Sequence, residues 1–531
     1  MNRTWRYLLG LFFLSLAVRL GVALLIRRPG YMDAAYYAAG AVRLAQSGGL
    51  SEPFIWNYLD DPTGIPHPGF LYWMPFPSLL AAPLAALFPD SFFTLQLPFA
   101  LLSALLPLVA FGLAWEVTGR RRTAWLAGLL TLFSGFFFPY WPLPETFAPF
   151  ALFGSLALWL AGCRMQDARR RMQDAGRWLL VGLLVGLAHL TRADGILLLP
   201  VVILPLLARP KSRTAHPAPR LVIGHWSLVI IHCSFLILGY LLVMSPWFLR
   251  NLSVIGTPLS PAGAKTLWLT TYDDLFCYNC DLSLRSYLAW GWGNVLHSKL
   301  WAAWVNFERF LAEDCLIFLC PFALVGLYRL RRHFPFALST IYLLLVYLAH
   351  SLAFTFPGPR GGFFHASAAV LPFLFAAGVE GLEAAVGWAA RRRRWSLRQA
   401  QTTFVTAAVV GAVALSAYAT AQKLLTWREA DAAYPEIGQW LTWQGAGNAT
   451  VMIANPPAFW YHTGHPAVVV PNEGVETLLD VCGRYGVSYL VLDPNCPAPL
   501  RALYEGRIVS SRLAPVATFE EGLVVMWRIE Q

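Results

Sequence analysis

Long apolar runs constrain this chain more than any other feature of its sequence. An α-helix needs about 20 mostly apolar residues to cross the hydrocarbon core of a bilayer. Runs of about that length lie at 5–26, 97–117, 123–141, 146–163, 221–248, 308–328, 335–356, 363–389 and 402–420. Two shorter runs, 178–190 and 195–208, flank a polar segment at 191–194 and are expected to form a hairpin or a broken helix. The sequence therefore predicts an α-helical polytopic membrane protein with about 11 membrane helices.

Composition supports this interpretation. Only 13% of the 531 residues are charged and 57% are hydrophobic, whereas a soluble protein carries about twice that charged fraction. The net charge is +11, but the basic residues stand in short clusters between the apolar runs. Clusters so placed point to membrane topology and to contact with anionic lipid headgroups, and no nucleic-acid partner is expected.

The basic clusters also predict the orientation, because positive residues favour the cytoplasmic side. The N-terminus and the clusters at 120–122, 164–177, 211–220, 329–332 and 391–394 are expected in the cytoplasm. The regions 27–96, 142–145, 249–307 and 357–362, and everything after residue 420, are then outside. The first run is expected to remain as a span, with Arg19 facing protein or water, since no cleavage signal follows it.

Residues 70–88 are apolar enough to insert into the bilayer, but a further span there does not fit this assignment of segments to the cytoplasm and the outside. A full span there would place the basic cluster at 120–122 outside, and Pro75, Pro77 and Pro83 are each costly inside a regular helix. We therefore expect a half-buried helix against the outer leaflet.

The composition changes after about residue 420, which divides the chain into a membrane domain, 1–420, and a C-terminal domain, 421–531. Short buried strands are expected near Val451 and Tyr489, with a helix over 473–485 between them and a last strand near Val524. Strand–helix–strand order predicts a small α/β domain with a parallel pair.

The cysteines offer two candidate disulfides outside the membrane. Cys277 and Cys280 lie in an outer loop, and Cys482 and Cys496 lie in the C-terminal domain. Either pair could be bridged in an oxidising compartment or remain as free thiols.

Polar side chains gather in the first outer loop. Asp33 and Tyr37 are four residues apart, so they share one face if the segment is helical, and Tyr36 lies beside them. A carboxylate at a membrane boundary can act as a general base, and aromatic rings at that depth can stack on sugars. The alternative is an acid that caps a juxtamembrane helix, with interfacial tyrosines.

Several motifs in order resemble the GT-C superfamily of membrane glycosyltransferases, which use polyprenyl-phosphate sugars. The nearest likeness is to its protein O-mannosyltransferase and aminoarabinose transferase branch. The motifs are Asp33-Ala-Ala-Tyr-Tyr37, His67-Pro-Gly-Phe-Leu-Tyr-Trp73, Pro144-Glu-Thr-Phe147, Gly186 to Gly195, Pro246 to Pro258, and Gly358-Pro-Arg360 followed by Pro372.

The resemblance implies a GT-C-like fold and transfer of a hexosyl or pentosyl group from a polyprenyl-phosphate sugar on the extracytoplasmic face. The setting would be the bacterial plasma membrane, and the acceptor a protein, lipid or glycan. Asp33 matches the first acid of the family and would take the acceptor's proton, and Glu145 matches the second. Glu145 could instead stabilise the start of the following helix.

The leaving phosphate needs cations, and Arg250, Lys265 and Arg360 are the candidates on the outer edge. The two arginines could alternatively reach the lipid headgroups. Arg192 and Asp194 are expected to pair and hold the break in their helix, or to serve the phosphate.

Tyr36, Tyr37 and His67 are the candidates for contact with substrate, although a histidine beside prolines is also a common turn residue. No metal ligand is assigned, and a divalent cation is left open as a cofactor.

Two other classes of protein fit a polytopic membrane chain: a secondary transporter and a non-catalytic assembly protein. Transporters place charges near the membrane midplane and often contain repeated halves. Here the acids gather at one face, and no repeated half is evident.

Overall fold

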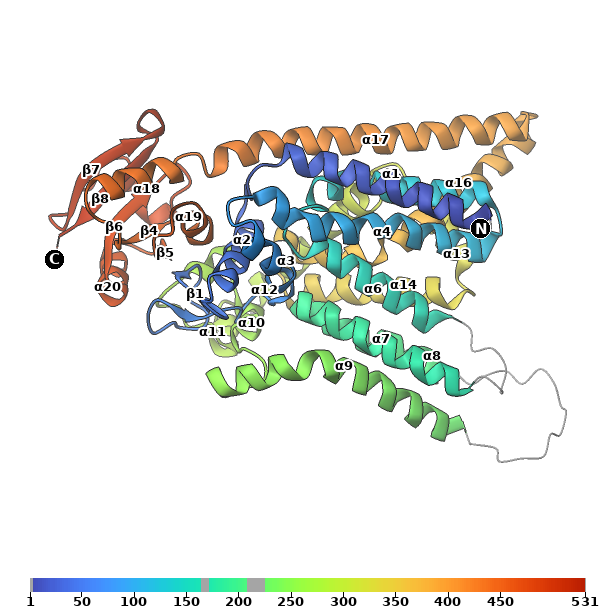
Figure 1. Ribbon diagram of the computed structural model, residues 1–531, viewed down its shortest axis with the longest axis horizontal. Helices are drawn as coiled ribbons and strands as arrows, with labels where there is room; N and C mark the ends of the chain where they lie inside the picture. The colour runs from blue at the N-terminus through green and yellow to red at the C-terminus, as the bar shows by residue number, and fades with distance from the viewer. Residues whose placement is uncertain (1–2, 164–170, 208–224, 531) are drawn as a thin grey trace.

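A computed structural model describes residues 3–163, 171–207 and 225–530 of the chain. Long helices lie side by side in a bundle, with a mixed α/β domain at one end and the N-terminus at the other (Figure 1). We call the end of the bundle that meets the α/β domain the domain end. The predicted basic cluster at 211–220 and the first part of the cluster at 164–177 lie outside the described residues.

Six helical segments of the described chain are long and apolar enough to cross a membrane. They are Trp5–Leu25, Phe92–Thr118, Trp226–Ile255, Phe334–Ala353, Gly358–Arg393 and Leu397–Trp443. Shorter apolar helices accompany them at Phe76–Leu87, Phe147–Gly162, Ala193–Leu207 and Cys320–Leu330. The prediction of a polytopic helical membrane protein is confirmed.

The helices of the bundle follow the predicted order. They are α1 (Arg3–Leu25), α4 (Phe92–Thr118), α5 (Arg121–Leu132), α6 (Phe147–Gly162), α7 (Arg171–Thr191), α8 (Leu198–Leu207), α9 (His225–Ile255), α13 (Cys320–Leu330), α14 (Phe334–Leu348), α16 (Leu371–Arg393) and α17 (Leu397–Ala430). α1, α4, α16 and α17 run along the long axis of the molecule (Figure 1). Arg19 is fully buried, with its guanidinium over the rings of Phe138 and Trp141 at 5.1 and 5.6 Å, so it faces protein as expected.

Two predicted spans are interrupted. The run expected over 123–141 ends as a helix at Leu132 and continues as the 3-10 helix η1 (Gly135–Tyr140), because Gly135 adopts a left-handed conformation and Pro139 follows. The run expected over 308–328 is broken by left-handed residues at Leu316 and Ile317, just before α13 begins. Length alone cannot reveal such breaks, since hydrophobicity continues through them.

The helical pair on either side of Arg192 is also broken, as predicted. α7 ends at Thr191, a short 3-10 helix, η3 (Ala193–Leu197), follows, and α8 begins at Leu198. Gly195 packs directly on the end of α7, where a Cβ atom would lie 2.6 Å from the backbone of Ala188. This close approach requires glycine.

Short elements cover the domain end of the bundle. They are α2 (Met32–Ala45), β1 (Ser51–Glu52), β2 (Phe54–Ile55), β3 (His67–Pro68), α3 (Phe76–Leu87), α10 (Ala262–Lys265), η4 (Thr266–Trp268), η5 (Tyr272–Phe276), α11 (Leu284–Ala289) and α12 (Trp292–Arg309). α3 has 12 residues and contains Pro83, so it is too short to span a bilayer alone, which agrees with the predicted juxtamembrane helix. Cys277 and Cys280 form a disulfide, whereas Cys482 and Cys496 are free.

The C-terminal domain is built on a six-stranded sheet in the order β2-β5-β4-β6-β8-β7. Its own elements are α18 (Tyr434–Trp443), β4 (Thr450–Ile453), α19 (Pro456–Thr463), β5 (Ala467–Val469), α20 (Val475–Tyr485), β6 (Val487–Leu492), α21 (Arg501–Tyr504), β7 (Leu513–Phe519) and β8 (Val524–Ile529). β4 pairs in parallel with both β5 and β6, and the last two strands are antiparallel. The predicted strands, helix and parallel pair are all present.

Two features connect the membrane domain with the C-terminal domain. α17 continues to Ala430, ten residues beyond the predicted border at 420. The sheet also takes its edge strand, β2, from the first outer loop, where Phe54 and Ile55 pair in parallel with β5. A composition change along the chain cannot disclose a strand contributed from about 400 residues away, because strand pairing depends on the folded shape.

Candidate active site

Asp33 lies in the first turn of α2, a helix that begins a few residues after α1 ends. Its side chain is 31% exposed, whereas the rest of the helix is mostly buried. The helix begins after Tyr31, which makes no side-chain cap, so Asp33 is not the N-cap residue that the alternative interpretation required. The carboxylate is therefore free to face the site.

Glu145 stands just before α6 and is almost fully buried, with 1% of its side chain exposed. Its carboxyl accepts hydrogen bonds from the backbone N–H of Phe147 at 3.0 Å and from the hydroxyl of Thr146 at 3.1 Å. The first of these satisfies a donor at the start of α6, so Glu145 does stabilise that helix. It also reaches the site, as the next contact shows.

His365 joins the two acids. It lies in α15 (Phe363–Ser367), which leads into α16, and its ring stacks on Phe147 with 3.9 Å between ring centres. Its Nδ1 is 3.2 Å from Glu145 and its Nε2 is 3.7 Å from Asp33. Three segments that are far apart in the sequence thus bring two carboxyl groups and an imidazole together, with ligand atoms within 4.8 Å of one another.

Burial changes the proton affinity of both acids. Desolvation raises the pKa of Asp33, and the positive charge of Arg192 opposes that rise. Desolvation also raises the pKa of Glu145, and the negative charge of Asp33 raises it further. Two carboxyl groups this close are not both ionised easily, so Asp33 loses its proton first and Glu145 keeps its proton to higher pH.

Arg192 is the cation that faces this acidic pair. It donates two hydrogen bonds to Asp194, from Nε at 2.9 Å and from Nη2 at 2.8 Å, so the predicted pairing is present. Asp194 also lies 3.1 Å from Nε2 of His350 on the neighbouring helical segment. The pair holds the break between α7 and η3 and directs a positive charge toward Asp33 and Glu145.

Arg360 is the one predicted phosphate ligand that lies near the acids. Its side chain is exposed, with the guanidinium 5.0 Å from the ring centre of Tyr272. The pKa of Tyr272 is raised to about 12, first by burial; the charge of Asp33 also raises it, while Arg360 lowers it. Asp33 and Arg360 therefore both lie around the same tyrosine.

Arg250 and Lys265 are used differently. Arg250 donates to the backbone carbonyl of Leu50 at 2.8 Å and lies over Trp247, which ties α9 to the first outer loop. Lys265 donates to the carbonyl of Leu59 at 2.5 Å. Both arrangements position backbone, and the structure does not bring either cation to the acidic pair.

The three predicted substrate contacts also separate. Tyr36 is buried and donates to Glu52, while His67 is buried with Nε2 2.9 Å from the carbonyl of Phe54. Both contacts lie within the first outer loop, and His67 lies in the strand β3 rather than in a turn. Tyr37 is buried near the acids, and the charges of Glu145 and Asp33 add to the burial that raises its pKa.

Asp33, Glu145 and His365 also form a donor set that could hold a metal ion. Two carboxylate oxygens and an imidazole nitrogen suit a divalent cation, and a fourth position would remain for water or substrate. With such a cation bound, both acids would be ionised.

Sequence reasoning missed His365. The residue carries a signal, because a histidine within a long apolar run is rare unless it faces the protein interior or a functional site. Its position, five residues after Arg360, gives no indication of which acids it meets, since that depends on how three helices pack.

Comparisons with known proteins agree with this architecture. Residues 67–237 match the family model described as dolichyl-phosphate-mannose-protein mannosyltransferase. This stretch is less than half of the chain and includes Glu145 and Arg192 but neither Asp33 nor His365. No curated protein matches the chain in sequence.

Solved structures are similar over nearly the whole chain. ArnT from Cupriavidus metallidurans, bound to undecaprenyl phosphate, has a TM-score of 0.58 at 15% identity, covering 99% of this chain and 98% of that one. The oligosaccharyltransferase of Archaeoglobus fulgidus, in complex with Zn and sulfate, has a TM-score of 0.57 at 14% identity, covering 98% of this chain and 73% of that one.

A third similar structure is the arabinofuranosyltransferase AftD from Mycobacteria, with a TM-score of 0.51 at 15% identity, covering 100% of this chain and 42% of that one. All three relatives are membrane glycosyltransferases of the GT-C type. The likeness extends over the membrane bundle and the C-terminal domain alike. The chain therefore has the fold of the GT-C membrane glycosyltransferases, the superfamily that its motifs resemble.

Proposed function

We propose that the protein transfers a sugar from a polyprenyl-phosphate donor to an acceptor at the extracytoplasmic membrane boundary, with Asp33 as the general base. The observation that carries the proposal is the meeting of Asp33, Glu145 and His365, where α2, the helix that holds Asp33, lies at the domain end of the bundle (Figure 1). Of the two acids, only Asp33 is exposed enough to meet a substrate.

The chemistry of transfer requires a base, a phosphate ligand and exclusion of water. The acceptor's hydroxyl or amine gives its proton to Asp33 as its oxygen or nitrogen bonds to the sugar carbon, and the bond from that carbon to the phosphate oxygen breaks. The polyprenyl phosphate leaves with the bonding electrons. Arg360, exposed beside Tyr272, stabilises the negative charge of the leaving polyprenyl phosphate.

His365 and Arg192 act on the base rather than on the substrate. His365 lies between the two acids and holds Asp33 at a set distance from Glu145. Arg192 supports the ionised form of Asp33 through its charge, since it lowers the pKa that burial raises. The relatives whose structures contain undecaprenyl phosphate, or dolichol phosphate with a peptide, support a lipid-linked donor and a separate acceptor.

The test is release of polyprenyl phosphate from a panel of polyprenyl-phosphate sugars by the purified protein in proteoliposomes with a membrane extract as the acceptor source. We expect Asp33→Asn to reduce the rate by about 10²- to 10⁴-fold. Asp90→Asn removes an exposed acid from the loop before α4 and is the matched control, with an unchanged rate.

Equal rates for the wild type and Asp33→Asn would refute the assignment of the base. Failure of every donor, together with uptake of a solute into the same proteoliposomes, would support the transporter alternative instead.

A further inference from the structure

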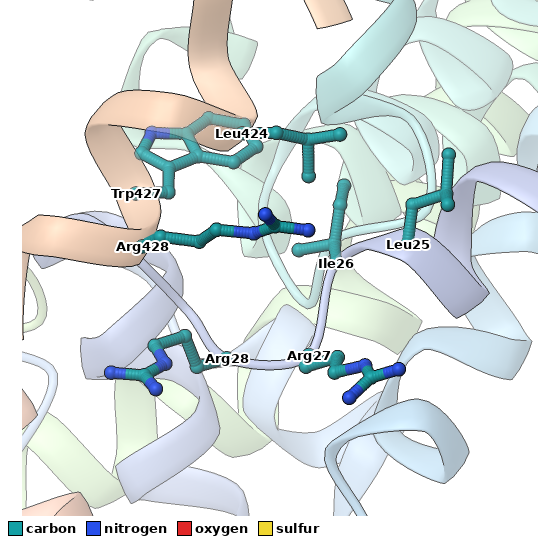
Figure 2. Close-up of a pocket in the computed structure, with 7 residues that line it drawn as sticks. All are labelled: Leu25, Ile26, Arg27, Arg28, Leu424, Trp427 and Arg428. Carbon is teal, nitrogen blue, oxygen red and sulfur yellow. The ribbon is translucent and has the colours of Figure 1, made fainter. Parts of the chain in front are cut away.

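A groove of about 440 Å³ lies between the end of α1 and α17 (Figure 2). Leu25, Ile26, Leu424 and the indole of Trp427 form its apolar part. Its remaining lining residues are all arginines, namely Arg27, Arg28 and Arg428. In Figure 2 the side chain of Arg428 extends from α17 toward Ile26, whereas the side chains of Arg27 and Arg28, on the segment that follows α1, point away from it to opposite sides.

No carboxylate neutralises these three arginines among the described residues. None of them takes part in an ion pair there. The acids that follow Arg428 on the chain do not compensate, because Glu429 is exposed without an ion pair and Asp431 is buried 3.5 Å from His462. The groove therefore presents a local excess of positive charge beside an apolar wall.

The groove lies at the end of α1, which is long and apolar enough to cross a bilayer. α1 has 23 residues, which at about 1.5 Å per residue is close to the thickness of the hydrocarbon core. Leu24, Leu25 and Leu425, around the groove, are exposed, as expected of side chains that face lipid. A lipid could thus place its acyl chains on this surface and its headgroup among the arginines.

The three arginines of the groove lie at an end of the first span where positive residues are not expected. In the orientation predicted from the sequence this end is extracytoplasmic, and positive residues beside the outer end of a first span oppose that orientation. One of the three arginines comes from α17 and two from the segment after α1, so two distant parts of the chain gather positive charge here. A phosphate group complements that charge, because guanidinium and phosphate form paired, charge-assisted hydrogen bonds.

The floor of the groove is well packed. Trp427 is buried and stacks on Tyr31 with 5.3 Å between ring centres, and a Cβ atom on Gly30 would lie only 2.3 Å from its side chain. Gly30 also has a φ of +74°, so a larger residue is excluded on two grounds. Tyr31 precedes Asp33 by two residues, so the floor of the groove adjoins the helix that holds Asp33.

We propose that this groove binds an anionic phospholipid, with its phosphate held by Arg428, its acyl chains along Leu25 and Leu424, and the positive charge of Arg27 and Arg28 at the rim. The site is separate from the one proposed for the sugar donor, and its occupancy does not require sugar transfer. It anchors α17, and therefore the C-terminal domain that follows, against the outer end of α1.

The test uses the full chain in nanodiscs of phosphatidylcholine with a minor fraction of phosphatidylglycerol, followed by native mass spectrometry of the released protein. We expect the wild type to retain phosphatidylglycerol preferentially. The triple variant Arg27→Gln, Arg28→Gln, Arg428→Gln should retain at most about a tenth of the wild-type amount. The matched control, Arg285→Gln, Arg501→Gln, Arg512→Gln, removes the same charge from exposed positions outside the groove and should retain the wild-type amount.

Equal retention by the groove variant and the wild type would overturn the proposal, and so would an equal loss in the control. If the triple variant fails to fold, as judged by its elution and melting curve, Arg428→Gln alone is measured and must still lower retention. Inorganic phosphate is added in a parallel sample. Displacement of the phospholipid by inorganic phosphate at equal concentration would also overturn the proposal, since it would show that the acyl chains contribute nothing.

Discussion

At the scale of single residues, Asp33 must be ionised to accept a proton, and its surroundings oppose ionisation. Burial raises its pKa above the ordinary aspartate value of about 4. A base with a raised pKa stays protonated, and so inactive, to a higher pH. We therefore expect the transfer rate to rise with pH through a midpoint clearly above about 4, measured as the rate at saturating donor across buffers of constant ionic strength.

Glu145→Gln is the companion variant for this pH profile. Because burial and the charge of Asp33 keep Glu145 protonated at neutral pH, an uncharged amide should preserve most of the rate there. It should also remove any loss of rate at high pH that comes from ionising Glu145. A loss of all activity in Glu145→Gln, matched by loss on chelation of divalent cations, would contradict this account and show that the three residues hold a metal.

Asp33 stood out in the sequence because a carboxylate in the first outer loop, beside two tyrosines, can act as a general base. Glu145 was assigned by resemblance to the second acid of the family, and Arg360 because the leaving phosphate that the resemblance implies needs a cation on the outer edge. Tyr36, His67, Arg250 and Lys265 were predicted with them, but their hydrogen bonds connect parts of the outer loops. Residue type and depth are readable from sequence, whereas the direction of a side chain is set by packing.

At the scale of elements, the break between α7 and α8 places Arg192 beside the acids, and Gly195 permits the break. We expect Gly195→Ala to lower the free energy of unfolding by about 1–3 kcal/mol, because its Cβ atom would overlap the backbone of α7. Thermal unfolding of the purified protein measures this.

Gly176→Ala is the control, since this glycine lies in α7 with open space where the Cβ atom would be. It should leave stability unchanged or raise it slightly, because alanine favours a helix. Similar melting temperatures for both variants would show that Gly195 is not required for the close approach.

At the scale of the whole molecule, the first outer loop and the C-terminal domain form one sheet. Ile55 of β2 is fully buried and packs in the hydrophobic core of the C-terminal domain, opposite Val468. We expect Ile55→Ala to cost about 2–5 kcal/mol and to speed hydrogen exchange in β5 as well as in the loop. Hydrogen–deuterium exchange with mass spectrometry measures both segments.

Ile508→Ala is the matched control, because the same side chain there is half exposed in the C-terminal domain. It should change stability by less than about 0.5 kcal/mol. Faster exchange in the loop alone, with β5 unchanged in Ile55→Ala, would show that the two regions unfold independently.

The sequence by itself determined that the chain lies in a membrane, that it is mainly helical, and that it ends in an α/β domain. These features depend on how many apolar residues each segment carries and on their spacing along the chain. It also located the break at Arg192, since polar residues cannot lie inside an apolar helix without protein around them. Tertiary structure alone decided that His365 joins Asp33 to Glu145, that β2 completes a distant sheet, and that three arginines line one groove. Each of these depends on the angles and distances between packed helices, and no local pattern encodes them.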